Sequence, residues 1–267
     1  GRGATAHRRT ARLCYLTWHC VYVRTVRQSA VSALEQAKTT SSNQKRIAPS
    51  GHNPAPAVQG AYRPVNIVII NADTYRYDNL HNNAEMPVNT PHLDRFAERA
   101  VSMSRMIAGS FPTIPERTDL ITGRFGWPWY PWQALAGSSP NCMPKLLADN
   151  GYASQLICDC PHLFNSGFQH VFDAAVQVRG QEGDMPFLRL NHDIQTVMPP
   201  EKTRSGVHYM GHSLVDVHRW TNQYWEHETQ TFPPRTAGMA MEWLEDNYKH
   251  HPFLLWVDFF DPHEPWD

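Results

Sequence analysis

Three short apolar runs stand out along the chain, and each predicts a buried strand. They cover residues 65–70 (VNIVII), 153–158 (ASQLIC) and 253–257 (FLLWV). Runs of this length, with little polar alternation, are typical of strands buried on both faces of a parallel sheet. The first run is followed by Asp73, which places a carboxylate at the carboxyl end of a strand, where open α/β sheets bind their ligands.

Helical periodicity separates these runs. Residues 93–101 place apolar side chains three and four positions apart, residues 143–150 form a second helical segment closed by Gly151, and residues 235–248 form a third. The alternation of strands and helices predicts an α/β fold, a doubly wound, mostly parallel sheet with helices on both faces. We expect this sheet to be incomplete at the C-terminus, because the chain stops soon after the third strand. Residues 164–234 show poor periodicity and predict loops and short helices over the active-site face.

Composition and charge divide the chain in two. With 267 residues, of which 41% are hydrophobic, the chain can bury a sizeable core. Residues 1–60 contain nine Lys or Arg against one Glu, about +8, so residues 61–267 carry about −9 of the total charge of −1. We interpret residues 1–60 as a basic, disordered leader and residues 61–267 as the folded domain. The acidic balance of that domain gives no support to nucleic-acid binding.

The leader contains one apolar stretch, residues 13–23, that resembles a short signal-peptide core. It is interrupted by polar residues and is too short to span a bilayer as a helix, so we expect no transmembrane segment. A cytoplasmic location is slightly favoured over secretion. The oligomeric state is left open.

The five cysteines match no zinc-ligand spacing. They are Cys14, Cys20, Cys142, Cys158 and Cys160. We expect packing residues, with a disulfide or a redox role as the alternative.

Residues 111–124 (FPTIPERTDLITGR) carry the strongest chemical pattern. Proline favours the first turn of a helix, so Thr113 is expected at a helix N-terminus, whose dipole favours anions and alkoxides. Arg117 lies one turn further on and can stabilise a deprotonated nucleophile or a bound oxyanion. The alternative is a surface helix that starts at proline and carries a buried arginine pair.

This segment resembles the signature of the sulfatase family, within the alkaline-phosphatase-like superfamily. In that signature a nucleophile is followed by x-Pro-x-Arg, two apolar positions and Thr-Gly-Arg. Residues 66–80 with 90–95 (TPHLDR) resemble the family's opening strand and helix start, and residues 253–265 resemble its strand ending in Asp-Pro-His-x-Pro. The chain is similar to the N-terminal part of a sulfatase-like catalytic domain.

The resemblance implies an ester hydrolase that acts on a small-molecule sulfate or phosphate-type ester. It implies that Asp73 and Thr113 bind a divalent metal ion, that Thr113 attacks and that Arg117 stabilises charge. His162 and His263 would hold the leaving group or the non-bridging oxygens. Arg124 and Asp159 fall at positions that contact the substrate, with Asp159 in place of the family's lysine.

Further metal ligands are expected from a strand beyond residue 267. We therefore expect the 267-residue chain alone to bind metal weakly and to turn over little. Calcium, manganese and zinc are not distinguished.

Three departures from the family pattern change the expected chemistry. Thr113 replaces the Cys or Ser that sulfatases oxidise to formylglycine, so formylglycine catalysis is not expected and a phosphate or phosphonate ester is favoured. Thr74 replaces a second acidic residue, as in the phosphonate monoester hydrolase and phosphodiesterase branch. With Asp159 in place of lysine, these changes leave open a catalytically inactive relative that serves as a binding or scaffold protein.

Several of these residues also have a purely structural interpretation. Asp73 is a possible helix N-cap, and both histidines are possible loop residues. The aromatic cluster of Trp127, Trp129, Tyr130 and Trp132 is expected to pack in the core, with a substrate pocket as the alternative.

Overall fold

The structure is a computed structural model. It describes residues 19–22, 64–80, 88–103, 105–126, 128–135, 141–188 and 207–264, together with 190, 191, 193, 194 and 196. The predicted leader lies outside the described residues, except for one short strand, β1 (His19–Tyr22). Trp127 also lies outside them.

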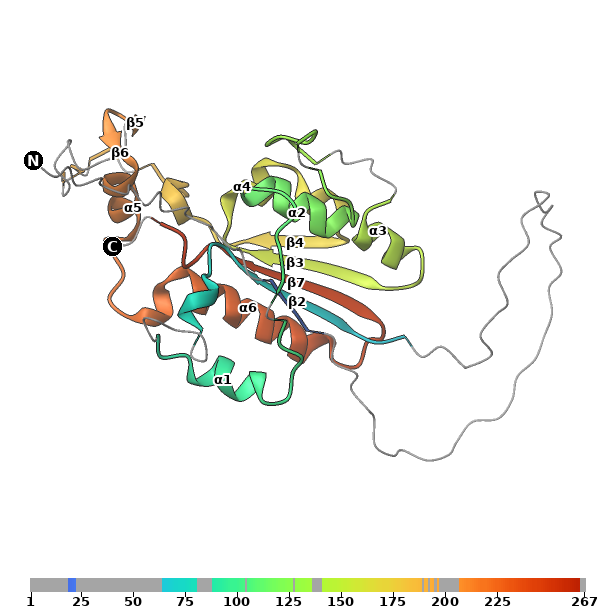
Figure 1. The fold of residues 1–267 in the computed structure, drawn as a ribbon. Coiled ribbons are helices and arrows are strands. Elements are labelled where there is room, and N and C mark those ends of the chain that lie inside the picture. The colour runs from blue at the N-terminus through green and yellow to red at the C-terminus, as the bar shows by residue number, and fades with distance from the viewer. Residues whose placement is uncertain are drawn as a thin grey trace, which may run out of the picture.

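A five-stranded sheet in the order β1-β2-β7-β3-β4 forms the centre of the fold (Figure 1). Its strands are β2 (Ile67–Ala72), β3 (Ala153–Cys158), β4 (Ala174–Gln177) and β7 (Phe253–Phe259), which run parallel, and β1, which pairs antiparallel with β2. The predicted strands are confirmed within two residues at each end. The sequence analysis missed β4.

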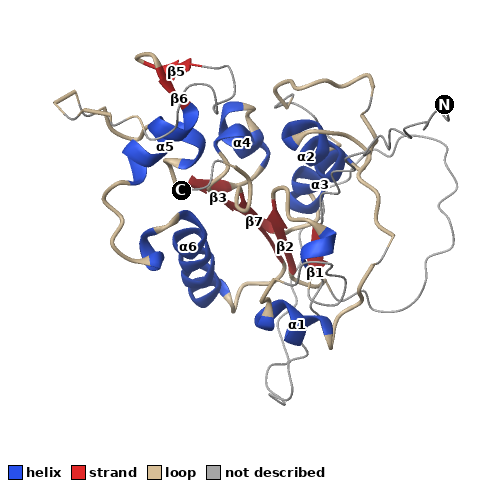
Figure 2. Ribbon diagram, turned by 60° about the vertical axis from the view of Figure 1, so that its left-hand side comes forward, coloured by secondary structure: helices blue, strands red, loops and turns tan. Residues whose placement is uncertain are grey.

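Helices cover both faces of the sheet, which confirms the predicted α/β class (Figures 1 and 2). One face carries α2 (Thr113–Thr122), α3 (Met143–Ala148) and α4 (Pro161–Asn165), and the other carries α1 (Pro91–Ala97) and α6 (Phe232–Asn247). Near the carboxyl ends of the strands lie α5 (Leu214–Asn222) and the hairpin of β5 (Val207–Tyr209) and β6 (His212–Ser213). The remaining short helices are η1 (Tyr77–Asn79), η3 (Phe168–Val171), η4 (Gln181–Gly183) and η6 (Glu228–Gln230).

The predicted helices form with shifted ends. The segment expected at 93–101 is helical from Pro91 to Ala97, and the last helix begins at Phe232 rather than at residue 235. In both cases a proline in the first turn starts the helix earlier than the apolar pattern indicates. Gly151 adopts φ +85° after α3 and ends it as expected.

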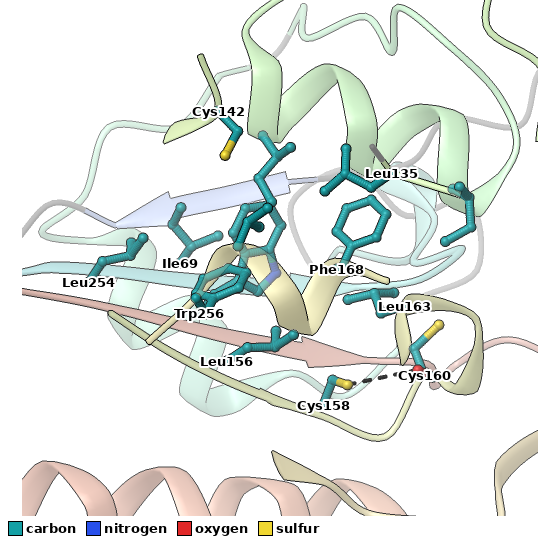
Figure 3. Close-up of a cluster of buried hydrophobic side chains, with 14 of the residues drawn as sticks. Ile69, Leu135, Cys142, Leu156, Cys158, Cys160, Leu163, Phe168, Leu254 and Trp256 are labelled. Carbon is teal, nitrogen blue, oxygen red and sulfur yellow. Dashed lines mark hydrogen bonds between the residues drawn. The ribbon is translucent and has the colours of Figure 1, made fainter. Parts of the chain in front are cut away.

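The side chains of β7 alternate between the two faces and build two cores. Leu254 and Trp256 point towards α2, α3 and α4 (Figure 3), whereas Leu255 and Val257 pack against α6. The same period of two places Asp258 on the face of the sheet to which Trp256 points, because Asp258 lies two residues after Trp256.

Three cysteines are buried free thiols in the first core, in agreement with the packing expectation: Cys142, Cys158 and Cys160. The exposed fractions of Trp129, Tyr130 and Trp132 are 77%, 52% and 45%. Core packing of these aromatic residues was therefore a wrong expectation. In the described part of the chain, no helix is both long enough and apolar enough to cross a membrane.

Candidate active site

Polar side chains gather where β2, β7 and β3 end. Asn71 of β2 lies opposite Asp258 of β7 in the strand register, and Asp73 and Asp159 directly follow β2 and β3. All four are buried, with at most 2% of their surface exposed. This edge is where an open parallel sheet binds its ligands.

Arg117 connects the ends of the two central strands from above the sheet. It lies on the second turn of α2 and is 1% exposed. Its Nη2 donates to Asp258 Oδ1 at 2.9 Å, and its Nη1 lies 3.0 Å from Asp73 Oδ2 and 3.4 Å from Glu116 Oε2. The position one turn after Thr113 therefore places the guanidinium directly over the predicted metal ligand Asp73.

Asp258 is the most heavily bonded of these carboxylates. Besides Arg117, its Oδ2 accepts hydrogen bonds from Asn71 Nδ2 and Trp256 Nε1, both at 3.0 Å. A buried carboxylate is stabilised when hydrogen-bond donors occupy its oxygens, and these donors hold Asp258 on the α2 face of the sheet. Sequence reasoning missed Asp258, Asn71 and Glu116. The period of two along β7 is the signal that would have placed Asp258 beside α2.

Acidic side chains outnumber basic side chains in this cluster. Burial alone would lower the pKa of Arg117, but Asp258, Asp73 and Glu116 outweigh burial and raise that pKa well above its ordinary value. Counted formally, three carboxylates and one guanidinium give the cluster a charge of −2. A buried excess of negative charge favours binding of a cation.

Thr113 is the first residue of α2, as the proline pattern predicts. It is 7% exposed, and among the described residues no side chain caps the amino end of this helix. The first backbone N–H groups of a helix lack intrahelical partners, so they and the helix dipole favour an anion beside Thr113. Thr74, directly after Asp73, has φ +52°, a conformation that is uncommon outside glycine and that concentrates at functional sites.

The two predicted histidines come together around one aromatic ring. His162, in the first turn of α4, meets the ring of Phe260 edge-on, with 5.7 Å between centroids. His263 stacks on the same ring at 4.3 Å and 23°. Because Phe260 follows β7, the ring places both histidines at the carboxyl edge of the sheet.

His162 has a carboxylate partner that the sequence did not reveal. Its Nε2 lies 2.5 Å from Glu182 Oε2, and Trp132 packs edge-on against its ring at 4.8 Å. Glu182 lies in η4 with φ +51°. A carboxylate on one ring nitrogen fixes the orientation of an imidazole and supports proton transfer by it.

Asp159 faces the other side of the sheet. Its Oδ2 accepts a hydrogen bond from Thr236 Oγ1 on α6 at 2.7 Å, and its Oδ1 accepts from the backbone N–H of Phe260 at 2.6 Å. Burial raises the pKa of Asp159 to about 7, and these two hydrogen bonds only partly oppose that effect. The structure therefore does not bring Asp159 together with Thr113.

Arg124 also lies apart from the cluster. It follows the C-terminal end of α2 and is exposed. A helix of this length rises about 15 Å from end to end, so Arg124 and Thr113 occupy opposite ends of α2.

The described residues do not form a complete metal site by themselves. Among them, no group of three or more His, Cys, Asp or Glu side chains has an arrangement that could hold a metal ion. Asp73 Oδ2 is buried and accepts no hydrogen bond, since its contact with Arg117 is an ion pair without hydrogen-bond alignment. A buried oxygen of this kind, in a cluster with excess negative charge, fits one ligand of a hard divalent cation.

The fold and site define an α/β protein with buried polar residues at the carboxyl edge of a mostly parallel sheet, the edge at which open α/β sheets bind their ligands. The sulfatase family model matches residues 65–267, and the chain belongs to this family. Steryl-sulfatase of Mus musculus is 33% identical over 118 residues, which cover 39% of this chain and 19% of that protein. N-acetylgalactosamine-6-O-sulfatase of Bacteroides thetaiotaomicron is 31% identical over 111 residues, which cover 37% and 20%. The chain thus spans about a fifth of these relatives. No solved structure matches it.

Proposed function

We propose that this protein is a metal-dependent hydrolase in which Thr113 attacks a phosphate or phosphonate ester. The observation that carries the proposal is the position of Thr113 at the uncapped start of α2, one turn before an arginine that contacts Asp73 and Asp258. Family membership supports the coarser class, a hydrolase of the sulfatase type.

Each residue of the cluster has a distinct part in this reaction. Asp73 and the Thr113 hydroxyl oxygen would hold the divalent ion, which supplies Lewis-acid chemistry and lowers the pKa of the hydroxyl when bound. The amino end of α2 stabilises negative charge on the attacking oxygen and on the ester. Arg117 keeps Asp73 in place and offsets part of the cluster's negative charge.

The identity of the nucleophile favours phosphorus over sulfur. In the reaction we propose, the Thr113 oxygen bonds to phosphorus, the P–O bond to the alcohol breaks, and the alcohol leaves with a proton. Water then hydrolyses the phosphothreonine and restores the hydroxyl. A threonine has no second hydroxyl on the same carbon, so it lacks the gem-diol with which the formylglycine hydrate of the family attacks a sulfate ester.

His162 would supply the proton to the leaving alcohol. Glu182 orients its ring, and Trp132 and Phe260 pack edge-on against it. His263, on the other face of Phe260, would contact a non-bridging oxygen of the ester.

The test compares the full-length protein with its Thr113→Ala and Thr113→Ser variants. Hydrolysis of 4-nitrophenyl sulfate, bis(4-nitrophenyl) phosphate and a 4-nitrophenyl phosphonate monoester is measured after chelation and after addition of manganese, zinc or calcium. We expect metal-dependent hydrolysis of the phosphorus esters, loss of turnover in Thr113→Ala and partial activity in Thr113→Ser.

Turnover that is unchanged in Thr113→Ala would refute the role of this hydroxyl. Faster hydrolysis of the sulfate than of either phosphorus ester would refute the substrate preference. The complete absence of turnover in the unmodified protein with every metal would favour a binding or scaffold protein.

A further inference from the structure

A second concave site lies on the β4 side of the molecule. A cavity of about 400 Å³ opens between the end of β4, the end of α5 and the start of α6. This volume is in the range of pockets that hold small organic molecules. None of the residues assigned above to the reaction lines it.

Strand register separates this cavity from the candidate active site. Gln177, which lines the cavity, pairs with Cys158 of β3, which in turn pairs with Asp258 of β7. Adjacent strands lie about 4.8 Å apart, so the cavity begins about 10 Å from Asp258, at the opposite edge of the sheet from β2. A small ligand held there does not reach the Arg117 cluster.

Five of the eleven residues that line the cavity are aromatic. Trp225 and Phe232 meet edge-to-face with centroids 4.7 Å apart, and Tyr224 beside them is 44% exposed. Aromatic side chains that are already packed against one another offer a rigid surface to a flat ring at small entropic cost.

One polar residue of the lining is turned inward. Asn222 is 4% exposed, its Nδ2 contacts His218 Nε2 at 2.9 Å, and its Oδ1 is buried. A covered oxygen is not available to a molecule in the cavity, so Asn222 shapes the wall and does not bind the ligand.

Arg235 is the polar residue of the lining that is open to a ligand. It lies in the first turn of α6, is exposed, and has no acidic partner in the described part of the chain. The other arginine of the lining, Arg179, is instead held by both oxygens of Asp184, at 2.9 and 2.6 Å. The positive end of the α6 dipole adds to the charge of Arg235, and together they favour an anion.

We propose that this cavity binds a planar aromatic molecule that has an anionic group. The ring lies against the aromatic wall at Trp225 and Phe232, and the anion pairs with Arg235. Since the site is separate from the ester-hydrolase chemistry, binding does not require Thr113.

The test uses 6-hydroxynaphthalene-2-sulfonate as the probe, in equilibrium dialysis with the full-length protein. This probe has both the ring and the anion, whereas 2-naphthol lacks the anion and methanesulfonate lacks the ring. We expect saturable binding of the probe, weaker binding of 2-naphthol and none of methanesulfonate. Thr113→Ala should bind the probe like the unmodified protein, which separates this result from the fate of the proposed catalysis.

Two arginine variants decide the role of charge. Arg235→Gln should weaken binding of the probe about tenfold or more and leave 2-naphthol unchanged. Arg219→Gln removes an equally exposed arginine from the neighbouring α5 without touching the cavity, so it should have no effect. Absence of saturable binding, or equal losses in the two arginine variants, would overturn the proposal.

Discussion

Replacement of Asp159 by asparagine should change how the stability of the protein depends on pH. Asp159 is fully buried between the ends of β3 and β7 and the start of α6. In Asp159→Asn the carbonyl oxygen still accepts from the Phe260 N–H, and the amide donates to Thr236 Oγ1. The variant therefore keeps both contacts and removes only the ionisable group.

The magnitude follows from the pKa of the buried carboxyl. Its native value is about 7, against an ordinary value of 3.8 that we take for the unfolded chain. Between these values the unfolded chain has lost the proton while the native protein keeps it, so stability falls as pH rises, and the loss is complete above about pH 7. At about 1.4 kcal/mol per pH unit, the full effect is on the order of 4 kcal/mol.

The assay is urea denaturation of both proteins from pH 5 to pH 7.5. Over this range the free energy of unfolding of the unmodified protein should fall by about 2.5 kcal/mol relative to that of Asp159→Asn, because only the former titrates at this position. Other groups titrate in both proteins and cancel in the difference. Asp246→Asn, at an exposed position of the same α6, should follow the unmodified protein at every pH.

Parallel curves for the unmodified protein and Asp159→Asn, whether they coincide or differ by a constant offset, would refute this reasoning. They would mean that water or a local opening lets Asp159 ionise in the native protein at no cost. The size of a constant offset would then report only the change in hydrogen bonding.

Three further changes test other parts of the structure. Arg117→Met should lower the free energy of unfolding, measured by urea denaturation, by about 3–5 kcal/mol, because three buried carboxylates lose their cation. A decrease in this free energy of less than about 1 kcal/mol would contradict the described network. Glu182→Gln should lower kcat about tenfold or more for esters of weakly acidic alcohols and much less for 4-nitrophenyl esters, because only a poor leaving group needs a proton from His162. Equal losses of kcat for the two kinds of ester would exclude this role of His162. Cys158 and Cys160 should stay unlabelled by iodoacetamide in the native protein, because burial raises both thiol pKa values well above their ordinary value. Peptide mass spectrometry measures the labelling, and rapid labelling would show that this core opens.

Much of the fold could be predicted because its central strands are continuous apolar runs. The side chains of residues 253–257 pack into both cores, so every position of this run is apolar and the sequence predicts its burial. Two elements could not be read in this way. The strand β4 is only four residues long and partly buried, and α5 buries Asp216, His218 and Asn222, so its pattern looks polar although it packs inward.

The candidate site was partly predictable for a similar reason. The helix start at Thr113 and the strand ends near Asp73 are local signals. The pairing of Arg117 with Asp258 spans 141 residues, and the contact between His162 and Glu182 depends on a short helix with an unusual backbone conformation. Contacts of this kind come from tertiary packing, which no local pattern specifies.

The ion pair between Arg117 and Asp258 also limits how the sequence can change over evolutionary time. Replacement of Arg117 alone leaves three buried carboxylates without their cation, and replacement of Asp258 alone leaves two guanidinium hydrogen bonds without an acceptor, so each passes through a destabilised intermediate. Among related proteins, a neutral residue at the position equivalent to 117 should therefore be accompanied by neutral residues at the positions of its carboxylate partners, including the one equivalent to 258.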